Sequence, residues 1–299
     1  MALAHAADRL ARTGLRVLMI DFDLEAPGLE QYFPIDQKAL RTRLGLFDII
    51  LRYKLAMSST APGASENQYF RQLNQFIAPI YPKLPTGGTL DLMPAGQRGS
   101  DEQLSEYALG LRQFDWQDFY FNFGGALFFE WLRRSLDGPL YDVVLVDSRT
   151  GVTEMGGICA YQLADTMAVF CAPNQQNMDG THNVVRNFLS QRVIQLRDGR
   201  ALKLLVVPAR VETRDEELLN VFQTRFQELF SNFEPKELTD AGLSFWDLLI
   251  PYEPQSAFQE RVIVPGSRVA RQSGWQARQS GWQIFDGTVF EDFGSELTR

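Results

Sequence analysis

The stretch Arg16-Val17-Leu18-Met19-Ile20-Asp21-Phe22-Asp23 decides the fold of this chain. Four consecutive apolar residues, bounded by charged ones, are typical of a short strand that is buried on both faces of a parallel sheet. Two carboxylates close the run, at what is then the C-terminal end of the strand. Because open parallel sheets bind their ligands beyond the carboxyl ends of the strands, Asp21 and Asp23 are the first candidates for a site.

Five further short apolar runs share this character. They lie at residues 91–93, 142–147, 166–171, 202–207 and 248–250. Helical patterns fall between them, at about residues 127–136, 178–195 and 215–230. Strands that alternate with helices predict an α/β fold, with a mostly parallel sheet and helices on both of its faces.

The region of residues 44–123 is poor in strand signals and ends in an unusually aromatic stretch. We expect a helical, aromatic-rich insertion packed on the sheet, within a single domain over residues 1–299. Core packing is the favoured reading of these aromatic residues, ahead of a ligand or partner surface. A C-terminal segment at about 256–299 contains a tandem duplication, because Ala-Arg-Gln-Ser-Gly-Trp-Gln at 270–276 is repeated at 277–283.

Composition narrows the functional classes. The 299 residues carry 29 Lys and Arg against 37 Asp and Glu, a formal charge of −8, which argues against a general nucleic-acid or anionic-membrane binder. Two cysteines, Cys159 and Cys171, exclude a disulfide framework and indicate a reducing compartment, the cytoplasm. No apolar run approaches the roughly 20 residues that a membrane-spanning helix needs.

The second strand with a carboxylate end is Asp142-Val143-Val144-Leu145-Val146-Asp147. A Mg²⁺ ion bound to a nucleotide is held largely by phosphates and waters, with one or two carboxylates from the protein. Asp21, Asp23 and Asp147 are placed for that task. Each acid taken alone has an alternative role, because an Asp at a strand end often caps the following helix.

Several of these segments resemble one family, the MinD/ParA deviant-Walker ATPases. Residues 17–29 resemble its switch I segment and residues 142–151 its Walker B strand and switch II; residues 92–96, 171–176 and 250–254 resemble further strand ends. The resemblance covers most of residues 1–255 outside the insertion. It implies a P-loop NTPase-like fold, with ATP and Mg²⁺ as cofactors, slow hydrolysis, a homodimer and a regulatory protein partner.

The resemblance also implies residue roles. Asp23 would help to position the attacking water, Asp21 would lie near the waters of the metal, and Asp147 would be the Walker B acid at the metal. Pro251 and Tyr252 belong to the segment that lies near the base in these proteins. Arg210 follows a strand where many relatives carry an Asn-Arg pair, so it could stack on a base or pair with Glu212.

One departure from the family is serious. In the family, a phosphate loop with the pattern Lys-Gly-Gly-x-Gly-[Lys/Arg]-[Ser/Thr] comes directly before the helix that Met-Ala-Leu-Ala resembles. Met1 of this chain stands just after the position of that loop. The strand before that loop is missing too, which would expose unpaired backbone groups and apolar faces. Truncation of a longer protein is the favoured explanation; a degenerate relative is the other.

The sequence therefore predicts a nucleotide-dependent switch of the MinD/ParA type, inactive as this truncated chain stands. The alternative is a non-catalytic interaction module that keeps the fold without nucleotide turnover.

Overall fold

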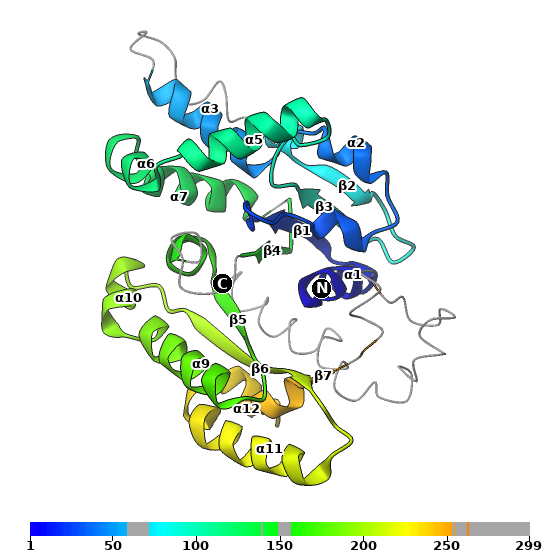
Figure 1. The fold of residues 1–299 in the computed structure, drawn as a ribbon, viewed down its shortest axis with the longest axis vertical. Helices are drawn as coiled ribbons and strands as arrows, with labels where there is room; N and C mark the ends of the chain where they lie inside the picture. The colour runs from blue at the N-terminus through cyan, green and yellow to red at the C-terminus, as the bar shows by residue number, and fades with distance from the viewer. Residues whose placement is uncertain (59–71, 139, 149–156, 253, 255–261, 263–299) are drawn as a thin grey trace. The chain divides into compact units, whose positions relative to one another are not determined.

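The computed structural model describes residues 1–58, 72–138, 140–148 and 157–252, together with residues 254 and 262. The chain divides into two compact units, Met1–Leu163 and Ala164–Arg299, here called the N-terminal and C-terminal units. Each unit has its own sheet and its own hydrophobic core (Figure 1). The duplication at 270–283 and most of the switch II segment lie outside the described residues. A single nucleotide-binding domain over the whole chain stays a prediction.

The N-terminal unit is built on a four-stranded sheet with the order β2-β3-β1-β4. The strands are β1 (Arg16–Asp21), β2 (Ala78–Tyr81), β3 (Thr89–Met93) and β4 (Val143–Asp147). β1 pairs in parallel with β3 on one side and with β4 on the other, while β2 pairs antiparallel with β3. The prediction of an α/β fold with a mostly parallel sheet is confirmed.

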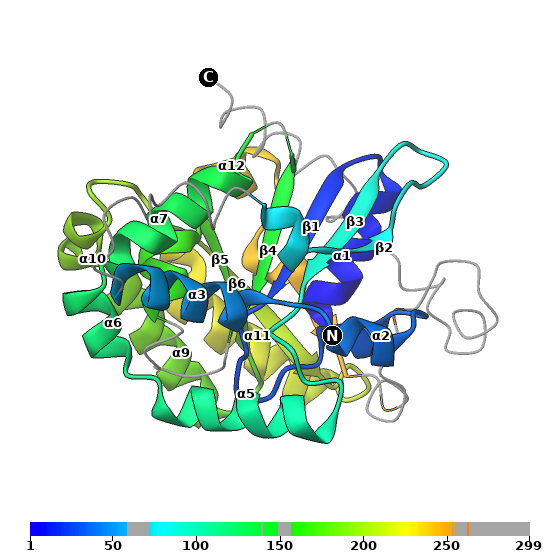
Figure 2. The ribbon, with the colours of Figure 1, turned by 90° about the horizontal axis from the view of Figure 1, so that it is seen from above.

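Helices cover both faces of this sheet (Figures 1 and 2). Helix α1 (Ala2–Arg12) lies on one face and buries Ala4, Ala7 and Leu10. The other face carries α3 (Leu46–Ser58), α5 (Asp101–Gln113) and α7 (Gly125–Leu136). Leu18 and Ile20 on β1, and Phe22 directly after it, alternate along the chain and belong to the core under these helices. Shorter elements are η1 (Leu29–Tyr32), α2 (Gln37–Arg41), η2 (Leu73–Phe76), α6 (Trp116–Asn122) and the π-helical turn η3 (Cys159–Leu163).

Phe119 on α6 lies at the centre of the aromatic region. Its side chain is fully buried, and its ring centroid lies 5.4–6.3 Å from six other rings. Those rings belong to Tyr53, Phe114, Trp116, Tyr120, Phe128 and Phe129. The prediction of a core function for this region is confirmed, with Phe121 as an exception because 86% of it is exposed.

The region of residues 44–123 contains two strands as well as helices. β3 corresponds to the predicted strand at 91–93, but β2 had no counterpart in the sequence. Its four residues include Pro79, the register shifts between Pro79 and Tyr81, and the strand lies at the edge of the sheet. Short, proline-bearing edge strands carry almost no alternating pattern, which explains why this one was missed.

The C-terminal unit has a parallel sheet with the order β5-β6-β7. The strands are β5 (Thr166–Cys171), β6 (Lys203–Val211) and β7 (Ile250–Pro251). The helical elements are α9 (Gln175–Phe188), α10 (Gln191–Leu196), α11 (Glu216–Phe230), η4 (Ser231–Phe233), α12 (Lys236–Asp240) and η5 (Phe245–Leu248). The helix expected over 178–195 is split, because Ser190 is extended and starts α10.

β4 and β5 are end strands of their sheets within the described residues. Both are apolar, and β5 alternates between exposed and partly buried positions instead of being buried on both faces. Phe170 on β5 has 49% of its surface exposed. No helix in the described part of the chain is long and apolar enough to span a bilayer.

Candidate functional site

The C-terminal edge of β1 and β4 brings the three predicted carboxylates together. In the parallel register, Asp21 at the end of β1 lies opposite Asp147 at the end of β4. Adjacent strands run about 4.8 Å apart, so the two acids are neighbours. The backbone N–H of Phe22 donates to the carbonyl of Asp147 at 2.9 Å, which continues the pairing toward Asp23.

Asp21 is buried, with 1% of its surface exposed, and its two carboxylate oxygens differ. Oδ2 accepts the backbone N–H groups of Gly28 and Leu29 at 3.0 and 3.2 Å, and so fixes the start of η1. Oδ1 is buried without a hydrogen-bond partner. Burial raises the pKa of Asp21 to about 7, and the negative charge of Asp147 adds to this shift.

Asp23 and Asp147 share the electrostatic environment of Asp21. Burial raises the pKa of Asp147, and the charge of Asp23 raises it further, while the amino group at Met1 lowers it. Oδ1 of Asp23 is also buried without a hydrogen-bond partner. Helix α1 therefore begins within electrostatic reach of this edge, where its N-terminal dipole favours negative charge.

The carboxylates of Asp21, Asp23 and Asp147 suit a metal ion whose remaining ligands come from a bound nucleotide and from water. Among the described residues no group of three His, Cys, Asp or Glu side chains could hold a metal ion. A nucleotide-bound Mg²⁺ needs only one or two protein carboxylates, since phosphates and waters complete its octahedron. The unpartnered oxygens of Asp21 and Asp23 are the observation that supports such an ion. Buried polar atoms without a partner are rare in folded proteins.

Tyr107 on α5 belongs to this site although the sequence gave no reason to select it. Its hydroxyl donates to the backbone carbonyl of Leu24, one residue after Asp23, at 2.7 Å. Burial raises the pKa of Tyr107, and the charges of Asp21 and Asp23 contribute to the shift. No local motif marks this contact, because it joins residues 83 positions apart.

Arg210, Pro251 and Tyr252, the predicted base-binding residues, lie together in the C-terminal unit. The guanidinium carbon of Arg210 lies 5.8 Å from the centroid of the Tyr252 ring, and Pro251 pairs with Val211 where β6 meets β7. Glu212 accepts the backbone N–H of Arg214 at 3.0 Å and forms its ion pair with that residue.

The backbone of Arg210 is left-handed, with φ of 58°. A non-glycine residue in this region costs on the order of 1–3 kcal/mol, and such strain concentrates at functional sites. The structure therefore presents Arg210 beside an aromatic ring, at the end of a strand.

Comparison with solved structures places the fold. Over 97% of this chain and 93% of the other, the chain is similar to apo McdA of Cyanothece, at 14% identity and a TM-score of 0.53. An ATP complex of a McdA variant from Cyanothece gives 13% identity and a TM-score of 0.52 over 98% and 92% of the two chains. The cell-division ATPase MinD of Pyrococcus furiosus gives 14% and 0.51 over 94% and 90%.

No protein-family model and no curated protein matches the chain. The structural likeness nevertheless extends over nearly the whole chain. The likeness shows the fold, an α/β arrangement of mostly parallel strands and helices that the chain shares with the ATPase MinD and with McdA. The roles of Asp21, Asp23, Asp147, Arg210, Pro251 and Tyr252 stay predictions.

Proposed function

We propose that the chain is a nucleotide-dependent switch of the MinD/ParA type. In this proposal it binds ATP with Mg²⁺ at the edge formed by Asp21, Asp23 and Asp147, and hydrolyses it slowly, coupled to homodimerisation and a regulatory protein. The observation that supports it is the pair of unpartnered carboxylate oxygens at the C-terminal edge of a parallel sheet. That McdA, which shares the fold, has a structure with ATP supports the choice of nucleotide.

The residues would divide the work as follows. Asp147 and Asp21 would face the metal and its waters, and Mg²⁺ would supply charge neutralisation for the phosphates. Asp23 would accept a hydrogen bond from the attacking water and orient it. Arg210 and Tyr252 would provide a flat, cationic surface for the base.

A phosphate loop of the family's type does not occur in the 299 residues. A phosphate loop offers backbone N–H groups, a lysine and a hydroxyl, and the 299 residues contain no glycine-rich stretch followed by Lys-Ser or Lys-Thr. We therefore expect these residues alone to bind ATP weakly and to turn it over undetectably.

A non-catalytic interaction module is the second candidate. Two hydrogen bonds favour this candidate, which Oδ2 of Asp21 accepts from backbone N–H groups. They give Asp21 a role in holding the loop after β1 that needs no ligand.

Calorimetry with Mg²⁺–ATP separates the two candidates. The 299-residue chain and, where the coding sequence continues upstream of Met1, the extended chain are titrated with and without Mg²⁺. The switch predicts Mg²⁺-dependent binding that Asp147→Asn weakens by at least about tenfold, or 1.4 kcal/mol. Asp142→Asn is the matched control at the other end of the same strand, where the acid pairs with Arg16 on the surface; it should leave binding within twofold.

Turnover tests the role of Asp23. In a chain with measurable hydrolysis, Asp23→Ala should lower kcat by about 100-fold while the Kd for ATP changes less than threefold. An equal loss in both quantities would contradict the water-orienting role. Absence of Mg²⁺–ATP binding in both chains would favour the interaction module and withdraw the carboxylate roles.

A further inference from the structure

A buried carboxylate lies in the loop that follows the candidate site. Glu30, in η1, has 1% of its surface exposed. It accepts hydrogen bonds from two arginines, from Nε of Arg41 at 2.8 Å and from Nη2 of Arg98 at 2.8 and 2.9 Å. A buried charge is costly unless it is paired and hydrogen-bonded, and both conditions hold here. We call these three residues the Glu30 cluster.

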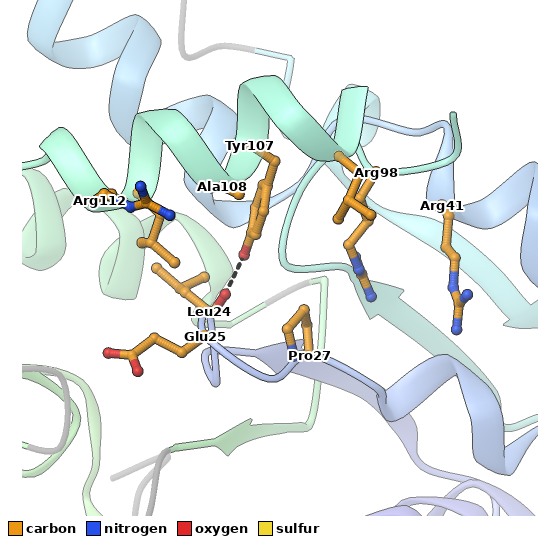
Figure 3. Close-up of a pocket in the computed structure, with 10 residues that line it drawn as sticks. Leu24, Glu25, Pro27, Arg41, Arg98, Tyr107, Ala108 and Arg112 are labelled. Carbon is orange, nitrogen blue, oxygen red and sulfur yellow. Dashed lines mark hydrogen bonds between the residues drawn. The ribbon is translucent and has the colours of Figure 1, made fainter. Parts of the chain in front are cut away.

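The Glu30 cluster joins three segments of the N-terminal unit. Glu30 follows β1, Arg41 ends α2, and Arg98 lies in the loop between β3 and α5. The side chains of Arg41 and Arg98 point in the same direction (Figure 3), and Glu30 receives both. The two arginine segments are also joined through the backbone, because the N–H of Arg98 donates to the carbonyl of Arg41 at 2.7 Å. The cluster therefore connects η1 to a frame made of two neighbouring segments.

Along the chain, the cluster adjoins the hydrogen bonds of Asp21. Gly28 and Leu29, the two residues before Glu30, donate their backbone N–H groups to Oδ2 of Asp21 at 3.0 and 3.2 Å. Oδ2 is thereby occupied, while Oδ1 is buried without a hydrogen-bond partner. Because a shift of Glu30 would move the peptide groups next to it, the cluster holds the two donors that decide which oxygen of Asp21 is free.

The charges of the cluster also reach Asp21. Burial is the main cause of the raised pKa of Asp21; the positive charge of Arg98 lowers this pKa, and the negative charge of Glu30 raises it. The two charges act on Asp21 with opposite sign. An effect of charge and an effect of position can therefore be separated by removing one partner at a time.

We propose that Glu30 is a positioning residue for Asp21. Through its pairs with Arg41 and Arg98 it holds residues 28–30 so that Oδ2 of Asp21 is occupied and Oδ1 is left for the ligand of the site. The inference rests on the proposed function for the identity of that ligand, a Mg²⁺ ion bound to ATP. Groups that orient a metal-binding carboxylate typically change metal affinity by about 10–100-fold when they are removed.

Amide hydrogen exchange tests the geometric part of the proposal without any ligand. In the full 299-residue chain, Glu30→Gln removes the charge and keeps the length of the side chain. Exchange at the N–H groups of Gly28 and Leu29, followed by mass spectrometry, should become at least about tenfold faster. Asp8→Asn is the matched control, because Asp8 is also buried and pairs with a partly exposed arginine, Arg12, at 2.8 Å. It should change exchange at these two groups less than about twofold.

The effect of Mg²⁺ on the Kd for ATP tests the role toward the metal. It is measured by calorimetry on the chain, 299-residue or extended, that binds Mg²⁺–ATP. Arg98→Met should reduce the tightening by Mg²⁺ about tenfold and change the Kd without Mg²⁺ less than about threefold. This variant separates position from charge, because the loss of a positive charge near Asp21 would by itself favour a bound cation.

Arg41→Met makes the same test if Arg98→Met does not fold, which circular dichroism and a melting curve establish. The side chain of Arg41 is 36% exposed, and that of Arg12, its matched control, is 34% exposed. Arg41→Met should reduce the tightening by Mg²⁺ about threefold, and Arg12→Met should change it by less than about 1.5-fold.

Several results would overturn the proposal. Unchanged exchange at Gly28 and Leu29 in Glu30→Gln, or equal acceleration in Asp8→Asn, would show that the cluster does not hold this loop, and the proposed function would stand. Tightening by Mg²⁺ that Arg98→Met leaves unchanged or increases would exclude a positioning role. If neither wild-type chain binds Mg²⁺–ATP, the proposed function is withdrawn, and faster exchange in Glu30→Gln then shows only structural support of the loop.

Discussion

At the end of β1, Asp21 holds two backbone N–H groups with one carboxylate oxygen and offers the other to no described residue. The first feature is structural and the second is typical of a binding site. Burial makes the ionised form of this acid costly, so its pKa lies near 7 instead of near 4. Asp21 therefore connects the stability of the N-terminal unit with the charge of the candidate site.

The raised pKa of Asp21 should make the free energy of unfolding depend on pH. Because the folded state binds the proton more tightly than the unfolded state, the stabilisation is complete below about pH 4 and is lost as pH rises to about 7. Relative to Asp21→Asn, which keeps an oxygen acceptor, the wild type should lose on the order of 4 kcal/mol across this range. Urea unfolding at a series of pH values measures the difference.

The control for this experiment is Asp101→Asn, an exposed acid in the first turn of α5. It should change the pH profile by less than about 0.5 kcal/mol. Parallel profiles for the wild type and Asp21→Asn would show that Asp21 ionises freely in the folded chain.

Among the elements, α6 carries two phenylalanines with opposite surroundings. Phe119 is fully buried among six rings, whereas Phe121, two positions later, is 86% exposed. Two positions on a helix are about 200° apart, so the two side chains point in nearly opposite directions.

This helix offers a matched pair for measuring core packing. Phe119→Ala should lower the free energy of unfolding by about 3–5 kcal/mol, because it removes a large ring and leaves a cavity between neighbours on three helices. Phe121→Ala should change it by less than about 0.5 kcal/mol. The two variants differ only in position, so similar losses measured by chemical denaturation would contradict the core assignment.

Elements with a strong local pattern could be predicted from the sequence. The apolar run 166–171 is β5, the aspartate-closed run 142–147 contains β4, and the periodic stretch 215–230 contains α11. β2 was missed because it is only four residues long and contains Pro79, so it lacks the alternation of apolar and polar residues that marks a strand. The break between α9 and α10 depends on one extended residue, Ser190, and periodicity does not register it.

Some residues of the candidate site could be predicted from the sequence and others could not. Strand ends placed Asp21, Asp23 and Asp147 at one edge, because parallel strands share the direction of their carboxyl ends. Tyr107 and the salt bridges of Glu30 could not be found from the sequence, since they join segments brought together only by tertiary packing.

At the scale of the whole molecule, the described residues form two sheets, and β4 and β5, each an end strand of its sheet among those residues, are apolar. Such strands present unpaired N–H and C=O groups and are templates for pairing with another chain. On β5 the half-exposed Phe170 adds an apolar contact to this edge.

A charge on β5 should therefore reduce self-association. We expect Phe170→Lys to lower the concentration-dependent light scattering of the 299-residue chain by severalfold, because a lysine on an edge strand opposes strand pairing. Leu196→Lys adds the same charge on α10, at a leucine with 59% exposure, and should have little effect. If both variants reduce scattering equally, net charge and not the strand edge is responsible.

The hydrogen bond from the hydroxyl of Tyr107 to the carbonyl of Leu24 connects α5 to the residue that follows Asp23. We expect a substitution that shifts α5 at Tyr107 to shift the loop that follows Asp23 as well. In the proposed switch, natural variation in α5 would then change how exposed the acidic edge is and how fast ATP is hydrolysed, without altering a single carboxylate.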